Sequence, residues 1–210
     1  MISLSEILHT IAQALMIPCL IILLVLMAGA VWQIGDIVVE YIAERRKRKC
    51  DVPQLLRDVH TAGADGLAEL IENSGLLRRQ KKALLELAES RGLPKDTLTA
   101  LAERLLATEE ARNARTTSIT DMIAKLGPMF GLLGTLIPLG PGIVALGQGD
   151  TVTLSESMNV AFDTTIAGVI SAAVASVISH IRKRWYNDDM VSLETLMEAV
   201  LEEVTSDVEG

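Results

Sequence analysis

The chain is poor in aromatic residues, cysteine and histidine, and these shortages exclude several classes of function. Only 3% of its 210 residues are Phe, Trp or Tyr. No basic stripe is interleaved with aromatics, so the surface that a nucleic-acid-binding protein needs is missing. The three histidines are far apart, and the two cysteines show no zinc-type spacing. We therefore expect no nucleic acid, no metal site and no cofactor.

The two cysteines do not form a redox motif. Cys19 lies inside an apolar run and Cys50 follows a basic cluster, so a disulfide would join a membrane core to its edge. We interpret both as small apolar residues. The sequence also lacks a nucleophile–base pair and a phosphate-binding loop. We therefore expect no catalytic residues and no enzymatic activity.

Apolar residues are abundant instead. They make up 50% of the chain, and the mean hydropathy is +0.36. They concentrate in runs at 10–35, 126–149 and 164–181, and the last run extends towards Ser157 if Asp163 is tolerated. A bilayer core of about 30 Å needs roughly 20 helical residues, and only these runs are long enough. The predicted fold class is all-α: an integral membrane protein with three transmembrane helices, helices extended into the cytoplasm and a helical cytoplasmic domain.

Positive charge is missing from two segments, and this absence predicts the topology. Residues 1–10 and 148–159 contain no Lys or Arg, whereas basic clusters follow the first and third runs at 45–49 and 182–184. Positive residues stay on the cytoplasmic side. We expect an outer N-terminus and a cytoplasmic C-terminus in the cell (inner) membrane. The first run lacks the basic start of a signal peptide, so we expect it to be retained.

The predicted boundaries divide the chain into six segments. These are 1–35 (outer N-terminus and transmembrane helix 1), 36–121 (cytoplasmic helical region), 122–149 (transmembrane helix 2), 150–156 (short outer loop), 157–181 (transmembrane helix 3) and 182–210 (cytoplasmic C-terminal helix). In the cytoplasmic region a helix is expected over 36–49, Pro53 opens another after Asp51, and a third covers 76–90. A long helix begins near Pro94 and runs into the second span. Their apolar faces predict a bundle, with a docking surface for another protein as the alternative.

Small residues recur in the second and third spans. At a spacing of four, residues of a helix share one face, and such a face lets helices approach closely. Packing alone would explain the pattern. The candidate helix-packing residues are Gly127, Gly131, Gly134, Gly168, Ala172 and Ser176.

Asp163 is the ionisable residue near the start of the third span, and Asn159 lies one turn before it. A charge in or near a membrane span is costly, so Asp163 and Asn159 are candidates for the ion path. The alternative is that Asp163 lies at the interface, reaches water or caps the helix start. Both interpretations stay open at this point.

Hydroxyl groups also occur in the spans, at Thr135, Thr164 and Thr165. They are candidates for lining an ion path, although a threonine can also bond to its preceding helical turn. Pro138 and Pro141 follow Thr135. They predict that this half of the second span is kinked or locally loosened.

The segment 127–135, GPMFGLLGT, resembles the second-span motif of the MotA/TolQ/ExbB proton-channel family, closest to the ExbB and TolQ branch. The segment 165–168, TIAG, is similar to the third-span threonine motif of that family. The predicted topology agrees as well. The resemblance covers residues 125–185 and is weak in the large loop.

The resemblance implies a homopentameric ring in membrane lipid, whose lumen holds a single-span ExbD- or TolR-like subunit with a membrane aspartate. Thr135 and Thr165 match the threonines that face this aspartate, and Thr164 is a further candidate. Relatives typically have a glutamate where this chain has Val160. A proton is the default ion and sodium the alternative. The implied function is a channel or stator subunit that converts ion-motive force into work; the alternative is a structural membrane scaffold whose cytoplasmic helices recruit proteins.

Overall fold

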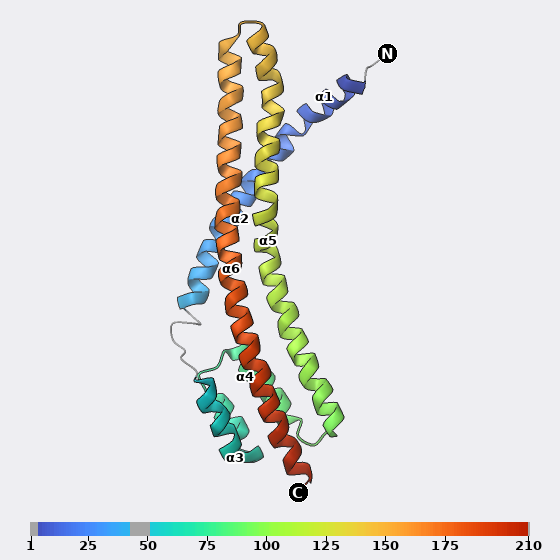
Figure 1. Cartoon of the computed structure of the whole chain (residues 1–210), viewed down its shortest axis with the longest axis vertical. Coiled ribbons are helices and arrows are strands. Elements are labelled where there is room, and N and C mark those ends of the chain that lie inside the picture. Colours follow the sequence, from blue (N-terminus) through green and yellow to red (C-terminus); the bar gives the residue numbers. More distant parts are fainter. Residues whose placement is uncertain (1–3, 43–50, 210) are drawn as a thin grey trace. The chain divides into compact units, whose positions relative to one another are not determined.

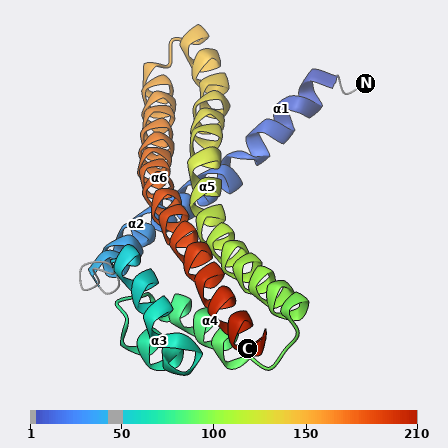
Figure 2. The same cartoon turned by 60° about the horizontal axis from the view of Figure 1, so that its bottom comes forward.

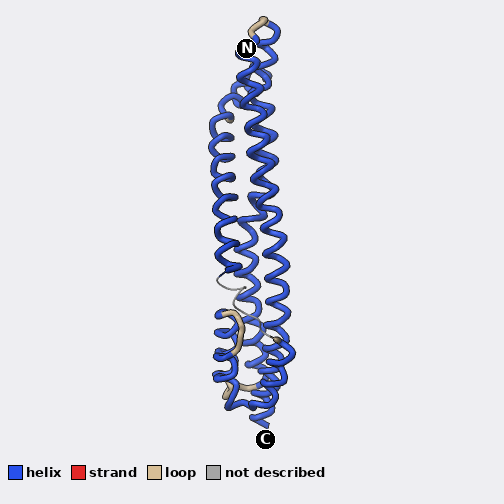
Figure 3. The backbone as a smooth tube through the Cα atoms, turned by 90° about the vertical axis from the view of Figure 1, so that its left-hand side faces the viewer, coloured by secondary structure: helices blue, strands red, loops and turns tan. Residues whose placement is uncertain are grey.

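The computed structural model describes the backbone of residues 4–42 and 51–209, and these residues form helices joined by short connections (Figures 1 and 3). The described part contains no strand, so the predicted all-α fold class is confirmed. Three helical stretches are long and apolar enough to cross a membrane, at Glu6–Glu40, Lys95–Gly147 and Thr151–Ser206. The helices are α1 (Leu4–Ala14), α2 (Met16–Glu40), α3 (Val52–Asn73), α4 (Arg78–Glu89), α5 (Lys95–Gly147) and α6 (Thr151–Glu209).

The first apolar run forms two helices rather than the single one predicted. A turn at Leu15 separates α1 from α2. Pro18 follows this turn and has no N–H to donate to the carbonyl of Ala14, so the ladder lacks a bond at this point. The helix predicted over 36–49 is seen as an α-helix as far as Glu40 and continues through residues 41–42 as a π-helical turn. Residues 43–50, with the basic cluster at 45–49 and Cys50, lie outside the described residues.

The chain divides into two compact units, which we describe separately. Unit 1 comprises Met1–Ile37 and Thr117–Ile181, and unit 2 comprises Val38–Thr116 and Arg182–Gly210. The long helices α5 and α6 therefore each contribute one part to unit 1 and another to unit 2.

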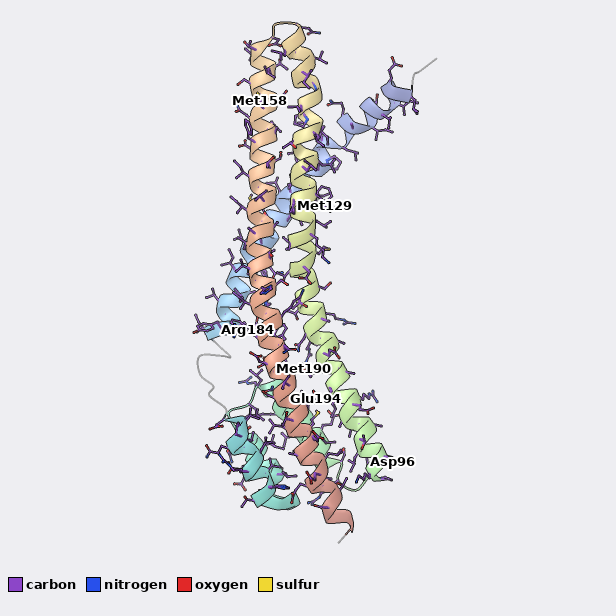
Figure 4. The ribbon with its side chains drawn as sticks, in the orientation of Figure 1. Asp96, Met129, Met158, Arg184, Met190 and Glu194 are labelled. Atoms are coloured by element: carbon purple, nitrogen blue, oxygen red, sulfur yellow. The ribbon has the colours of Figure 1, made fainter. Side chains whose placement is uncertain are left out.

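In unit 1, α5 and α6 run antiparallel side by side, and α2 packs against both (Figures 1 and 2). The buried contact between the three helices is small. Most large apolar side chains of this unit are exposed, including Met129 on α5 and Met158 on α6 (Figure 4). An apolar outer surface is expected where lipid is the solvent. The buried cluster that joins the helices is Leu26, Ala30, Ile123 and Ala175.

Unit 2 has the opposite arrangement, with its large apolar side chains inside. Its α3 and α4 lie beside the C-terminal part of α6 (Figures 1 and 2). Asp51 caps α3 by accepting a bond from the Gln54 N–H at 3.4 Å, as the Asp51–Pro53 signal predicts. Gly63, with φ 63° and ψ 175°, interrupts α3 with a conformation that is essentially restricted to glycine. Fully buried residues of this core include Leu67, Leu84, Leu87, Leu98, Leu193, Leu196 and Val200.

The connection between α5 and α6 is shorter than the loop predicted over 150–156. Only Gln148–Asp150 is non-helical, and α6 begins at Thr151. The reason is the Asp150 carboxylate, which accepts bonds from the Thr153 N–H at 3.1 Å and the Thr153 hydroxyl at 2.6 Å. These bonds lower the pKa of Asp150 and satisfy the first turn of α6.

The prolines of the second span do not interrupt α5. The helix stays continuous through Pro128, Pro138 and Pro141, so it does not break there. The kink or loosening expected in this half stays a prediction. Each proline removes one N–H donor from the helical ladder. Membrane helices tolerate this loss because neighbouring groups and small local adjustments satisfy the freed carbonyls.

Candidate functional site

The contact between α5 and α6 in unit 1 is made by backbone. A Cβ atom on Gly168 would lie 2.5 Å from the carbonyl oxygen of Gly127 and 2.9 Å from the Cα of Gly131. A Cβ on Gly127 would lie 2.7 Å from the carbonyl oxygen of Gly168. Only glycine fits at these distances. We call Gly127, Gly131 and Gly134 of α5 and Gly168 of α6 the glycine seam.

The seam continues at Gly134, which lies against Thr164 of α6. A Cβ on Gly134 would lie 2.6 Å from the Cβ of Thr164. Thr164 is only 5% exposed, and its hydroxyl donates to the carbonyl oxygens of Val160 at 2.9 Å and Ala161 at 3.0 Å. Thr164 therefore packs in the seam within this chain. Its role in an ion path stays a prediction.

Thr135 and Thr165 lie next to this contact on their respective helices and are half-buried. The Thr135 hydroxyl donates to the Leu132 carbonyl oxygen at 2.6 Å, and the Thr165 hydroxyl donates to the Ala161 carbonyl oxygen at 3.0 Å. Each proton is thus used by the preceding turn, while the hydroxyl oxygen retains the capacity to accept. The seam brings two hydroxyl acceptors to one level of the helix pair.

The small-residue row of α6 divides between two environments. Gly168 and Ala172 are buried in the contact with α5, whereas Ser176 is exposed. Residues four apart advance by 400° in total, so the row drifts by about 40° per step around a helix with 3.6 residues per turn. Ala175 and Ser179 take the buried positions further along. Packing of Ser176 against another helix stays a prediction.

Asp163 and Asn159 are both exposed on this chain. Asp163 lies two residues before Thr165, which on an ideal helix places their side chains about 200° apart. The structure therefore does not bring Asp163 together with the half-buried Thr135 and Thr165. A role of Asp163 and Asn159 in the ion path stays a prediction.

A pair of polar contacts near one end of unit 1 was not anticipated from the sequence. The Ser179 hydroxyl of α6 donates to the Asp121 carboxylate of α5. Beside it, the Thr120 hydroxyl donates to the Gln33 amide oxygen of α2 at 3.0 Å. Sequence reasoning treated Asp121 only as the last residue of a polar segment. The spacing of Ser171, Ala175 and Ser179 along α6 was the available signal that Ser179 faces α5.

Unit 2 contains a buried ion pair where α6 enters it. Arg182 is 2% exposed, and its Nε donates to Glu40 of α2 at 3.1 Å. Tyr186, one turn later, has its pKa raised to about 12, first by burial and then by the negative charge of Glu40. A buried arginine keeps its charge, so Glu40 compensates it locally.

A groove of about 780 Å³ lies between α4 and α5 of unit 2. Its charged lining is mainly positive, although Glu86 and Glu109 also reach it. Arg112 contacts Glu109 at 3.4 Å. The groove is suited to a negatively charged partner rather than to an apolar one. Its basic residues are Arg79, Lys82, Arg104, Arg112 and Arg115.

No group of three or more His, Cys, Asp and Glu residues within the described part of the chain is arranged to hold a metal ion. Cys19 is a free, buried thiol whose Sγ donates to the Phe130 carbonyl oxygen at 3.4 Å. The candidate site of unit 1 therefore consists of the glycine seam, the hydroxyl groups of Thr135 and Thr165 beside it, and the Asp121 carboxylate further along α5.

Residues 70–195, more than half of the chain, match the sequence model of the MotA/TolQ/ExbB proton channel family. The matched range includes the glycine seam, Thr135, Thr165 and the Asp121–Ser179 contact. A comparison with curated proteins gives no match. The chain belongs to the MotA/TolQ/ExbB proton channel family.

Proposed function

We propose that this chain forms the wall of an ion-motive-force-driven channel complex, a stator that energises transport or envelope work through a partner subunit. The family match supports a proton-channel role. The observation that carries the proposal is the glycine seam, which holds Thr135 and Thr165 at one level of the α5–α6 pair. A wall element needs such fixed polar groups in an otherwise apolar surface.

The proposed complex contains five copies of this chain around a lumen. Thr135 and Thr165 cannot by themselves carry a proton at physiological pH, because alcohol hydroxyls do not ionise there. The carboxylate that takes up the proton is therefore assigned to a second, single-span subunit of the ExbD or TolR type inside the ring. The wall supplies hydroxyl oxygens that accept a hydrogen bond from this group while it is the neutral acid.

The proposed topology follows the charge bias of the sequence. The N-terminus lies outside, and unit 2 with the C-terminus lies in the cytoplasm, in the cell (inner) membrane. Transmembrane helices within 1–35, 122–149 and 157–181 then leave the connection between α5 and α6 at the outer surface. Assignment to the ExbB and TolQ branch and the choice of a proton over sodium belong to this proposal.

Proton flux tests the threonine roles directly. The complex is purified through a tag on this chain, reconstituted in liposomes and followed with an enclosed pH-sensitive dye under an imposed potential. Thr135→Val and Thr165→Val keep the side-chain volume and remove the hydroxyl, so we expect both to reduce flux. Repeating the assay with sodium as the only gradient distinguishes the two ions. Undiminished flux in both variants would remove the assigned roles.

The groove of unit 2 favours a second candidate function, a scaffold that recruits an acidic protein segment. Its five basic residues outnumber its two carboxylates. Replacing Arg112 and Arg115 by glutamate would then abolish capture of the partner while leaving flux unchanged. Loss of flux together with retained capture would instead favour the channel as the main function.

A further inference from the structure

Two polar pairs occupy equivalent places along the α5–α6 contact. Thr135 and Thr165 form the first pair, and Asp121 and Ser179 form the second. Each member of the second pair lies 14 residues from its counterpart, backwards along α5 and forwards along α6. Because the helices are antiparallel, both shifts lead towards the same end of unit 1.

The shift also preserves the side of each helix. Fourteen residues make about 1400°, which is within roughly 40° of four full turns, and they span about 21 Å. Asp121 therefore lies on nearly the same side of α5 as Thr135, and Ser179 on nearly the same side of α6 as Thr165. The two pairs follow one line along the helix pair.

The Asp121–Ser179 contact lies at the end of the apolar surface. Ile119, Met122 and Val177 are exposed there, and so are Lys125, one turn after Asp121 on α5, and His180, next to Ser179 on α6. Ser179 is only 4% exposed, and its hydroxyl donates to the Asp121 carboxylate. A carboxylate at the edge of an apolar belt is expensive compared with a neutral acceptor. The bond to Ser179 needs only an acceptor, which the amide oxygen of an asparagine would supply equally well, so this bond alone does not require an ionisable group.

A neighbouring contact shows what a purely structural bond at this level looks like. Thr120 is fully buried, and its hydroxyl donates to Gln33 of α2 at 3.0 Å. Both partners are neutral. This bond joins α2 to α5 without an ionisable group. Asp121 lies at the same level but differs from Thr120 and Gln33 because it can bind and release a proton.

We propose that Asp121 is a proton relay on the inner side of the channel, positioned by Ser179; this inference rests on the proposed function. Beyond the threonine level the proton is carried by water, and an O–H bond of the hydronium ion breaks as a carboxylate oxygen of Asp121 takes the proton and becomes a neutral acid. The O–H bond of this acid then breaks as the proton passes to water on the cytoplasmic side. The carboxylate is regenerated, and Ser179 holds its orientation throughout.

Three substitutions distinguish a proton-relay role of Asp121 from a purely structural one. Asp121→Asn keeps an acceptor for Ser179 but removes the proton-binding group. Asp121→Ala removes both, and Asp121→Glu keeps the acid. We expect Asn and Ala to lose most of the proton flux in reconstituted complexes and Glu to retain most of it. Thr120→Val is the matched control, and it should lower thermal stability while leaving flux per assembled complex unchanged.

The outcomes distinguish the relay from the function on which it rests. Normal flux in Asp121→Asn, with flux still sensitive to Thr135→Val, would overturn the relay and leave the proposed channel intact. Failure of the wild-type complex to conduct protons would overturn the channel itself. If Asp121→Asn assembles poorly, flux is normalised to the complex recovered, and recovery of flux in Asp121→Glu decides for the relay.

Discussion

Units 1 and 2 are built from the same two long helices but are held together in opposite ways. In unit 1 the helices meet through glycine, with Gly168 against Gly127 and large apolar side chains turned outward. In unit 2 leucine and valine fill the interior, and the surface is charged. The same helix thus changes its packing chemistry along its length.

The difference reflects the solvent of each part. In water, burying large apolar side chains drives association, at roughly 25 cal/mol per Å² of apolar surface. In lipid that driving force is absent between helices, and close backbone approach with hydrogen bonds takes its place. Large side chains in unit 1 then face lipid, and small residues set the distance between helices.

The largest expected loss of stability comes from a substitution in the core of unit 2. Leu98→Ala removes a side chain that is 0% exposed and should cost about 2–5 kcal/mol, because it leaves a cavity. Leu132→Ala in unit 1, where the side chain is 61% exposed, should change stability by about 0.5 kcal/mol or less. Thermal unfolding in detergent, followed by circular dichroism, measures both. Equal losses would show that the two units are not packed differently.

The next largest loss of stability is expected when a single methyl group is added in the glycine seam. Gly168→Ala places a Cβ 2.5 Å from the carbonyl oxygen of Gly127, which should force α5 and α6 apart at a cost of about 1–3 kcal/mol. Gly140→Ala is the matched control, since nothing lies within 4 Å of its Cβ position. Thermal stability and the yield of assembled complex report the outcome. A Gly168→Ala protein as stable as Gly140→Ala would contradict the seam.

The smallest expected effect is a pH dependence of stability that arises from Tyr186 in unit 2. The pKa of Tyr186 is raised from 10.0 to about 12, so the unfolded chain loses this proton first as pH rises. The resulting stabilisation is present below pH 10 and is lost between the two pKa values. The wild type should therefore lose more thermal stability between pH 9 and pH 11 than Tyr186→Phe. Parallel losses in the two proteins would remove Tyr186 as the cause.

Much of the fold followed from local sequence. The helix start after Asp51 and the long helix from Pro94 into the second span were predicted, because these signals lie within a few residues of their effect. The turn at Leu15 and the helix start at Thr151 were missed. The first depends on Pro18 inside an apolar run, and the second on an aspartate that had been assigned to a loop.

The candidate site was less predictable. The glycines and threonines could be named from the motif, but contact between Gly127 and Gly168 depends on the register of two helices. Local periodicity does not fix that register, so the sequence could not show that Gly168 and Ala172 contact α5 while Ser176 is exposed on this chain, and Asp121 was overlooked. The Asp121–Ser179 contact joins residues that are distant in sequence, and only the register of the antiparallel pair brings them together.

The central claim is that this chain is one wall element of a larger ring. Native mass spectrometry of the complex, extracted in nanodiscs through a tag on this chain, tests it most directly. We predict five copies of the chain together with a small single-span subunit. A stable monomer without a second protein would contradict the account.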